Sequence, residues 1–147
     1  MLNRNGKAYL YPTMAIDTNQ PALKTRSTGN LESIFNRDQI SKIWVRGGTG
    51  NTTPSADDVD LYEANSTLTE IDNTDTQKKS ARTYEDNFIL TVSTTYQNNT
   101  GNDITIKELG MFIHESYNNR DIMIARQLVD PVIVRAGRSY AFTMTIG

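Results

Sequence analysis

The chain has 147 residues, a formal net charge of −2, 37% hydrophobic residues and no cysteine, which suits a single domain large enough to bury a core without cross-links. The lack of cysteine excludes disulfides, thiol catalysis and cysteine-held zinc. The interspersed charges imply no general affinity for nucleic acid or anionic membranes, and no stretch approaches the ~18 apolar residues of a membrane-spanning helix.

Residues 1–28 are predicted to form an extended arm with at most one strand. Their apolar side chains are scattered, and Pro12 and Pro21 interrupt them. An arm of this kind is expected to become ordered on a neighbouring subunit. The candidate partner-binding residues of the arm are Tyr9, Leu10, Tyr11, Met14 and Ile16.

Residues 29–147 are predicted to form one domain, which opens with two short helices and a strand. A polar cap followed by apolar residues at helical spacing predicts a helix over 31–41. The β-rich segment 42–46 predicts a strand. Ser55 and Asp58 fit a capping box, which predicts a second helix over 56–63.

The C-terminal half is predicted to consist of strands. Residues 87–96 alternate between two faces with a period of two, which is the strongest pattern in the chain. Short turns separate this segment from further predicted strands over 104–114, 122–128, 131–134 and 139–146. The predicted fold is therefore mainly β: an antiparallel β-sandwich with one or two short helices and the extended N-terminal arm.

One carboxylate falls on an apolar face of the predicted strand 104–114. Glu108 alternates in phase with Ile104, Ile106 and Phe112. A carboxylate on such a face is costly unless it is hydrogen-bonded or paired. Arg126 on a following strand is a candidate partner, with backbone N–H groups as the other candidates. The alternative, an edge position where the face is wet, stays open.

Residues 46–61 read RGGTGNTTPSADDVDL and have the composition of a ligand-binding loop. A phosphate-binding loop needs a lysine after its last glycine, and Asn51 stands there instead. A calcium loop needs alternating ligands and a glycine at its sixth position, which Asp57, Asp58 and Asp60 do not fit because Val59, Leu61 and Tyr62 break that order. We therefore expect no cofactor and no metal, but a shaped turn. Its expected structural residues are Gly47, Gly48, Gly50 and Pro54.

A catalytic centre finds little support in the sequence. His114 is the only histidine, and its place at the end of a predicted strand is typical of a surface histidine. No pair of carboxylates stands out for glycoside cleavage. We therefore expect a non-enzymatic protein. A sugar-binding face would need exposed aromatic side chains, and the candidates do not cluster in sequence: Trp44, Tyr62, Tyr96 and Tyr117.

Two separated motifs resemble a pattern of small structural proteins of tailed bacteriophages. The first is WVRGGTGNTTPSADDVDLYEA, residues 44–64, and the second begins ITIKELGMFIHES at residue 104 and continues through DIMIARQL to residue 146. The same order is similar to that in attachment domains of tail-collar fibre proteins: a glycine-rich turn, an E-x-G-x-F strand that holds Gly110, and a strand containing Ala-Arg. The chain departs from the pattern at Arg46, Leu109 and Met111.

The resemblance implies a multi-copy structural component on the exterior of a tailed-phage virion, assembled in the host cytoplasm. Capsid decoration or head-fibre anchoring is favoured, because a chain that ends at Gly147 after its last predicted strand carries no fibre shaft. The implied partners are capsid, neck or tail subunits and further copies of the chain. A tail or baseplate adaptor for a tail fibre and a host-glycan-binding module remain the alternatives.

Overall fold

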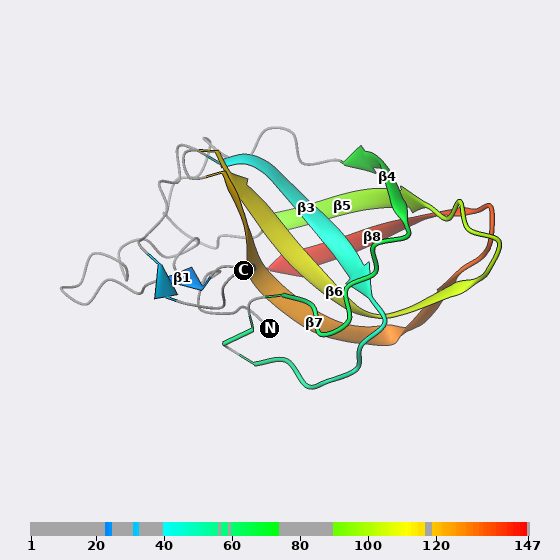
Figure 1. The fold of residues 1–147 in the computed structure, drawn as a ribbon, viewed down its shortest axis with the longest axis horizontal. Coiled ribbons are helices and arrows are strands. Elements are labelled where there is room, and N and C mark those ends of the chain that lie inside the picture. The colour runs from blue at the N-terminus through cyan, green and yellow to red at the C-terminus, as the bar shows by residue number, and fades with distance from the viewer. Residues whose placement is uncertain are drawn as a thin grey trace.

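The computed structural model describes a protein built from β-strands (Figure 1). The described residues are 23–24, 31–32, 40–55, 57–58, 60–73, 90–116 and 119–146. Their strands are β1 (Leu23–Lys24), β2 (Leu31–Glu32), β3 (Ile40–Gly48), β4 (Thr69–Asn73), β5 (Leu90–Gln97), β6 (Ile104–Glu115), β7 (Arg120–Val134) and β8 (Ser139–Ile146). No helix occurs within those ranges, and the prediction of a mainly β protein is confirmed.

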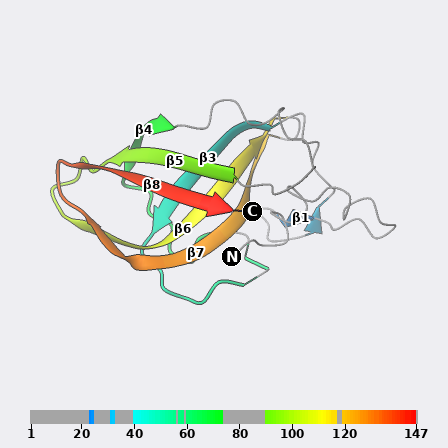
Figure 2. The ribbon, with the colours of Figure 1, turned by 180° about the vertical axis from the view of Figure 1, so that it is seen from behind.

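The long strands form two antiparallel three-stranded sheets. Strands β3, β6 and β7 make the first, which we call sheet I, with β6 in the middle. Strands β4, β5 and β8 make the second, which we call sheet II, with β5 in the middle. In Figure 2, seen from behind, β5 and β8 lie in front of the strands of sheet I. Strands β1 and β2 form a separate two-stranded ribbon.

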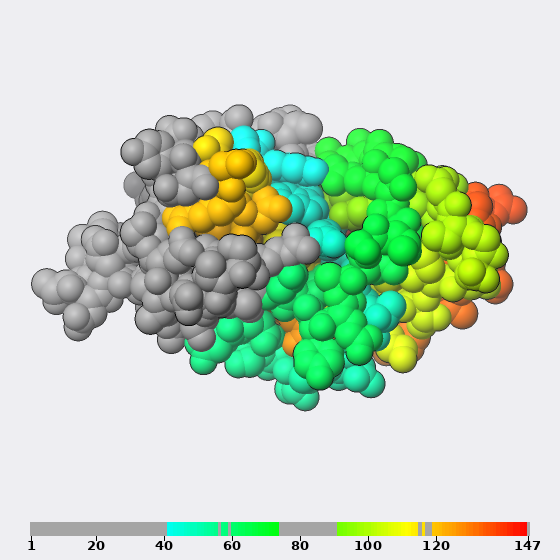
Figure 3. Space-filling model, viewed as in Figure 1, coloured from blue at the N-terminus to red at the C-terminus, as the bar shows by residue number. Residues whose placement is uncertain are grey.

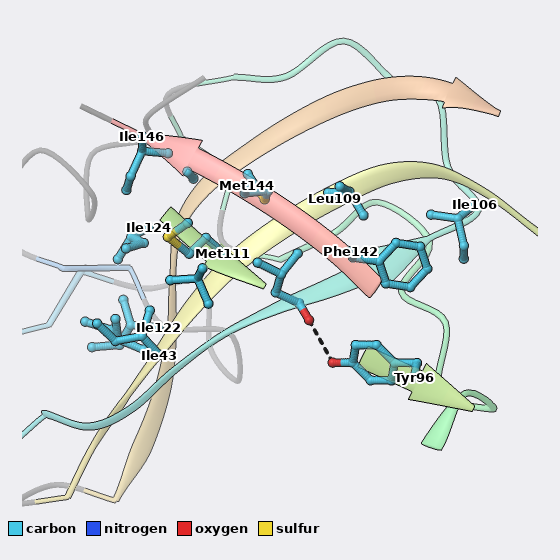
Figure 4. Close-up of a cluster of buried hydrophobic side chains, with 14 of the residues drawn as sticks. Ile43, Tyr96, Ile106, Leu109, Met111, Ile122, Ile124, Phe142, Met144 and Ile146 are labelled. Atoms are coloured by element: carbon cyan, nitrogen blue, oxygen red, sulfur yellow. Dashed lines mark hydrogen bonds between the residues drawn. The ribbon is translucent and has the colours of Figure 1, made fainter. Parts of the chain in front are cut away.

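The two sheets share one apolar core. Its buried side chains come from β3, β6 and β7 of sheet I and from β5 and β8 of sheet II. Figure 4 shows several of them, including Ile43, Met111, Ile124, Phe142 and Met144. Each such side chain stabilises the fold by roughly 1.5–3 kcal/mol. We call the side of sheet I toward this cluster its core face and the opposite side its loop face.

Strands β5 and β8 show the alternation that the sequence predicts. Because successive side chains of a strand point to opposite faces, only every second residue reaches the core. The buried ones are Val92, Thr94, Tyr96, Phe142, Met144 and Ile146. Tyr140, which is in phase with the buried residues of β8, remains 40% exposed because it lies near the start of the strand.

The alternation of β6 is interrupted just before Glu108, which changes the predicted phase of this residue. The pairing of β6 with β7 shifts between Ile106 and Glu108. Ile106 belongs to the shared core, whereas Glu108 lies opposite Gly48 on the loop face. The prediction that Glu108 shares a face with Ile104 and Ile106 is therefore wrong, since the register irregularity at this point interrupts the alternation of side chains along β6.

Strand β7 is one long strand where two segments were predicted. It runs from Arg120 through Pro131 to Val134, and Pro131 lies where the pairing with β6 is interrupted, a place where a strand tolerates proline. A second register shift leaves Ile124 without a direct partner on β6. This shift moves Arg126 off the face of Ile122 and onto the loop face, opposite Gly110.

Neither predicted helix is found among the described residues. The predicted helix 31–41 starts with β2 and ends with the first residues of β3, and residues 33–39 lie outside the described part. Within the predicted helix 56–63, the described residues 57–58 and 60–63 are not helical. Its capping contact does form, since the Asp58 carboxylate accepts the Ser55 N–H at 2.8 Å, but contacts with sheet I hold the following backbone in a non-helical path. Strand β4 follows this loop, in a segment for which no strand was predicted.

Most of the predicted arm lies outside the described residues. Of residues 1–28, the structure describes only Leu23–Lys24, which pairs with Leu31–Glu32. The arm, and the domain boundary after residue 28, therefore stay predictions. The same holds for the candidate partner-binding residues, all of which lie outside the described ranges: Tyr9, Leu10, Tyr11, Met14 and Ile16.

Candidate functional site

The described residues of the loop 49–65, which are 49–55, 57–58 and 60–65, cover the loop face of sheet I. The loop leaves the end of β3 and returns beside it, where Ala64 bridges to Gly48. Leu61 of this loop is buried against a second apolar cluster formed by Trp44, Phe112 and Met123. In Figure 3 the teal and green atoms of the segment lie on the near face of the molecule. The glycine-rich motif is thus packed onto the sheet.

The side chain of Glu108 on β6 binds the main chain of this loop. This side chain is fully buried, with 0% exposed. Its Oε1 accepts the main-chain N–H of Glu63 at 2.8 Å, and its Oε2 accepts that of Tyr62 at 3.1 Å. The same Oε2 accepts a hydrogen bond from Arg126 Nε at 2.7 Å. The expected ion pair with Arg126 and the expected backbone donors are both present.

Arg126 links β7 to the first half of the same loop. Besides the bond to Glu108, its Nη1 donates to the Asp58 carboxylate at 3.0 Å and its Nη2 donates to the carbonyl oxygen of Thr52 at 2.7 Å. A guanidinium group offers five N–H donors in one plane, so a single side chain reaches three partners. We call Glu108, Arg126 and these loop partners the loop anchor.

The loop anchor is an ion pair withdrawn from water. The side chains of Arg126 and Glu108 are 2% and 0% exposed, while Asp58 at the margin is 23% exposed. Burying charges is costly, and only good geometry with satisfied hydrogen bonds compensates for it. Here both oxygens of Glu108 and three nitrogens of Arg126 bind groups of the chain itself, so the charges serve to hold the loop against the sheet.

Gly47 and Gly48 lie inside β3, so the turn begins later than predicted. Neither glycine has a positive φ. Instead, the absence of a side chain at each position lets a neighbouring segment pack directly against the backbone of β3. A Cβ atom on Gly48 would lie 2.7 Å from the carbonyl oxygen of Glu63 in the loop. On Gly47 it would lie 3.0 Å from the side chain of Ile106 on the core face. The loop and the core therefore press on opposite sides of this strand end.

Gly50 and Gly110 complete the space that the loop anchor needs. A Cβ atom on Gly50 would lie 2.8 Å from Glu108 Oε1. A Cβ atom on Gly110 would lie 2.9 Å from the side chains of both Leu61 and Phe112. Gly47 lies on the core side of β3, and Pro54 is half-buried in the loop. The other predicted structural residues lie together at the loop anchor: Gly48, Gly50, Glu108, Gly110 and Arg126.

The acidic residues of the loop bind partners within the chain. Asp58 pairs with Arg126, and the Asp60 side chain accepts the N–H of Leu61 at 2.8 Å. Within the described ranges, no three histidine, aspartate or glutamate side chains gather as a metal site requires. The carboxylates of this loop therefore act as internal acceptors in the structure.

A second polar cluster joins the two sheets beside β3. Thr94 accepts the N–H of Val45 at 2.9 Å and donates to the side chain of Asn73 at 3.0 Å. The Tyr96 hydroxyl donates to the carbonyl oxygen of Val45 at 2.8 Å, the dashed line of Figure 4. Asn73 donates to the carbonyl oxygen of Ile43 at 2.8 Å. Side chains of sheet II thereby satisfy the free edge of β3.

The environment of Tyr96 keeps its hydroxyl protonated. Burial raises the pKa of Tyr96 well above its ordinary value of 10.0, the negative charge of Glu70 raises it further, and Arg46 lowers it. The phenol therefore remains a hydrogen-bond donor to β3 throughout the neutral range.

His114 forms a surface pair at the end of sheet I. Its Nδ1 lies 2.8 Å from the carboxylate of Asp121 on the adjacent strand, and both side chains are partly exposed. The Ser41 hydroxyl contacts the main-chain carbonyl oxygen of His114 at 3.5 Å rather than its ring. The described contacts of His114 therefore do not include a serine–histidine pair.

Several polar residues of these clusters were not predicted from sequence. Asp58 was expected to cap a helix, and its role as a partner of Arg126 depends on a contact between residues 68 positions apart. Asn98 is buried and donates to the carbonyl oxygens of Asn102 and Val134 at 2.8 Å, which no pattern indicated. Thr94 left a signal, because it interrupts the apolar face of β5.

Comparison of the chain with protein-family models, with curated proteins and with solved structures finds no match in any of the three. Within the described residues, no helix has the length and apolar character needed to cross a membrane. Inferences about function therefore depend on the geometry and on the sequence motifs.

Proposed function

We propose that this chain is a structural, non-enzymatic component of a tailed-bacteriophage particle, and that its two sheets form a β-sandwich. The loop anchor carries this proposal. Glu108 of the E-x-G-x-F motif and Arg126 of the Ala-Arg strand bind the main chain of the glycine-rich motif. The motifs that resemble the phage pattern are therefore parts of one packing unit, as expected if the pattern encodes architecture.

The chemistry of the loop anchor supports a non-enzymatic role. A catalytic acid or base must reach a substrate with a group that is free to transfer a proton. Glu108 is fully buried and accepts three hydrogen bonds from the chain. Its companion Arg126 is 2% exposed, so both side chains face the protein interior.

The proposed setting is the exterior of the phage head, where many copies would decorate the capsid or anchor a head fibre. The partners would be capsid or neck subunits and further copies of the chain, reached in part through residues 1–28. The arm's prolines and isolated apolar residues suit a segment that becomes ordered on a neighbour. A tail or baseplate adaptor would use the same architecture at a different place on the particle.

A host-glycan-binding module receives less support from the positions of the aromatic residues. Sugar rings stack on exposed aromatic faces, but Trp44 and Tyr96 are each only 7% exposed. Tyr62 is 65% exposed, and Tyr117 lies outside the described residues. The described aromatic candidates therefore do not form a shared stacking surface.

Labelling of intact particles tests the proposal. Antibodies against the purified chain would be applied to phage particles whose genome encodes this sequence, and the gold label would be located by electron microscopy. The proposal predicts regular labelling of the head, and mass spectrometry of the same particles should detect the chain in many copies. Label confined to the tail would establish the adaptor alternative, and particles without the chain would contradict the proposal.

A further inference from the structure

Edge strands expose main-chain N–H and C=O groups that can pair with another chain. Sheets I and II have four edge strands among the described residues: β3, β7, β4 and β8. Proteins protect such edges with charged side chains, prolines, bulges, short strands or covering groups. The four edges of this molecule differ in how much of this protection they carry.

Three of the edges are protected. The free edge of β3 is covered by the hydrogen bonds of Thr94, Tyr96 and Asn73. Strand β4 is five residues long, has a register shift and carries acidic side chains. Strand β7 contains Pro131, several charged residues and two register shifts. None of these three strands offers a regular, uncharged edge.

Among the residues that the structure describes, β8 shows none of these protections. Its sequence, SYAFTMTI, contains no proline and no charged residue. All eight of its residues pair with β5 without a register shift, from Ser139 to Ile146. Within the part of the chain that the structure describes, no strand pairs with the second edge of β8. This edge therefore has the regular geometry that main-chain pairing with another strand requires.

The outward side chains of β8 are small and uncharged. Ala141, Thr143 and Thr145 are exposed, and they face the equally uncharged outer side of β5. Hydroxyl pairs already join the two strands: Thr143 donates to Ser93 at 2.9 Å, and Thr91 and Thr145 lie 2.9 Å apart. Threonine pairs across antiparallel strands are favourable, whereas like charges would repel.

These features fit a second copy of the same strand. A two-fold axis brings a residue that lies near the axis close to its own counterpart, so a charged residue at the centre of the paired edges would face its own charge. Strand β8 avoids that repulsion, and Thr143 lies near its midpoint. Tyr140, which is 40% exposed and packs on Phe142 with ring centroids 5.2 Å apart, would become more covered at the end of the paired strands.

We propose that two copies of this chain pair through β8, antiparallel about a two-fold axis, so that sheet II of one copy continues into sheet II of the other. The six-stranded sheet would run in the order β4-β5-β8 of one copy followed by β8-β5-β4 of the second. This contact concerns the chain alone, and it holds or fails independently of the particle in which the chain acts.

Sedimentation equilibrium of the full chain over a range of concentrations tests the contact. Thr143→Lys would place two ammonium groups close together across the two-fold axis and should raise the dimer dissociation constant by about tenfold or more. Thr91→Lys is the matched control, because it also introduces a lysine on the same face and breaks one hydroxyl pair, but on the central strand. It should leave the dissociation constant within about twofold of the parent.

Mixing of oppositely charged variants separates loss of contact from loss of folding. Thr143→Glu alone should dissociate like Thr143→Lys, and an equimolar mixture of the two should form a dimer again, because the charges then attract. A parent chain that stays monomeric would overturn the proposal. Equal weakening by Thr91→Lys and Thr143→Lys, or a mixture that remains monomeric, would also overturn it.

Discussion

Sheets I and II have three strands each, but they differ in what covers their outer faces. Sheet I carries the shared core on one face and the loop of residues 49–65 on the other, so β6 is buried at every position from Glu108 to Ile113. Sheet II carries the core on one face and exposed hydroxyl groups on the other. The difference shows that packing of a single loop is enough to cover the second face of sheet I.

The two coverings place different demands on the sequence. The exposed face of sheet II accepts threonine and serine with few packing constraints. The loop face of sheet I needs glycine where the loop lies close, apolar side chains under Leu61, and a buried ion pair to satisfy the loop backbone. Substitutions on the loop face should therefore be far more damaging than substitutions on the exposed face of sheet II.

Glu108→Ala should be the most damaging single substitution on the loop face. It leaves Arg126 buried without its closest carboxylate and frees two N–H groups of the loop. Removing one partner of a buried ion pair lowers the free energy of unfolding by about 3–5 kcal/mol. Thermal and chemical unfolding at neutral pH would measure this loss.

Glu63→Ala is the control for that substitution. Glu63 lies in the same loop, but its side chain is exposed and bonds the Thr49 hydroxyl at 2.9 Å. Its removal should change the free energy of unfolding by no more than about 0.5 kcal/mol. Similar losses for both variants would mean that Glu108 does not anchor the loop as a buried carboxylate.

Gly110→Ala should be the next most damaging change. The added methyl group would lie 2.9 Å from Leu61 and Phe112, and overpacking of this kind costs about 1–3 kcal/mol. Gly101→Ala provides the contrast, because a Cβ atom there has nothing within 4 Å. Unfolding curves of the two variants should separate clearly, and identical curves would show that the loop does not press on Gly110.

Thr94→Val tests the polar link between the sheets. The substitution keeps the shape but removes the acceptor for the Val45 N–H and the donor to Asn73. Leaving such a buried group unsatisfied costs about 1–3 kcal/mol. Thr91→Val, on the exposed face of the same strand, should cost less than about 0.5 kcal/mol. Denaturant titration of both variants compares them, and a larger loss for Thr91→Val would contradict the assignment of faces.

Tyr96→Phe should show the smallest effect, and that effect should depend on pH. The pKa of Tyr96 is raised in the folded state, so the unfolded chain loses the phenol proton first as pH rises past the ordinary value of 10.0. The parent therefore loses stability above that pH, while the variant lacks this contribution. The stability difference between them should shrink from about pH 8 to about pH 11. An unchanged difference would contradict the buried environment of Tyr96.

The amino-acid sequence was sufficient to predict the strands that are covered on only one face. Strands β5 and β8 follow a period of two. Strand β8 has the predicted extent, and β5 ends one residue after the predicted residue 96. Asn119, between β6 and β7, takes a positive φ of 49°, a backbone angle that asparagine adopts more readily than most residues. The pairing of Glu108 with Arg126 was also predictable, because a carboxylate among apolar residues needs a hydrogen-bonding or charged partner and the neighbouring strands offer few of them.

The amino-acid sequence was insufficient to predict side-chain phase and local backbone structure where contacts between distant segments determine them. The shifts at residues 107 and 124 reverse side-chain phases without a sequence signal, so Glu108 was placed on the wrong face. The segment 56–63 has a capping contact, but Glu108 binds its main-chain N–H groups from β6 and no helix forms. Such long-range contacts override local propensity.

Hydrogen exchange at two amides tests directly whether Glu108 holds the loop against sheet I. Tyr62 and Glu63 are exposed residues, and their amide protons should nevertheless exchange slowly because both donate to the Glu108 carboxylate. In Glu108→Gln, the exchange of these two amides should accelerate strongly while the amides of β5 keep their protection. Rapid exchange at residues 62 and 63 in the parent, or rates unchanged by Glu108→Gln, would contradict this role of Glu108.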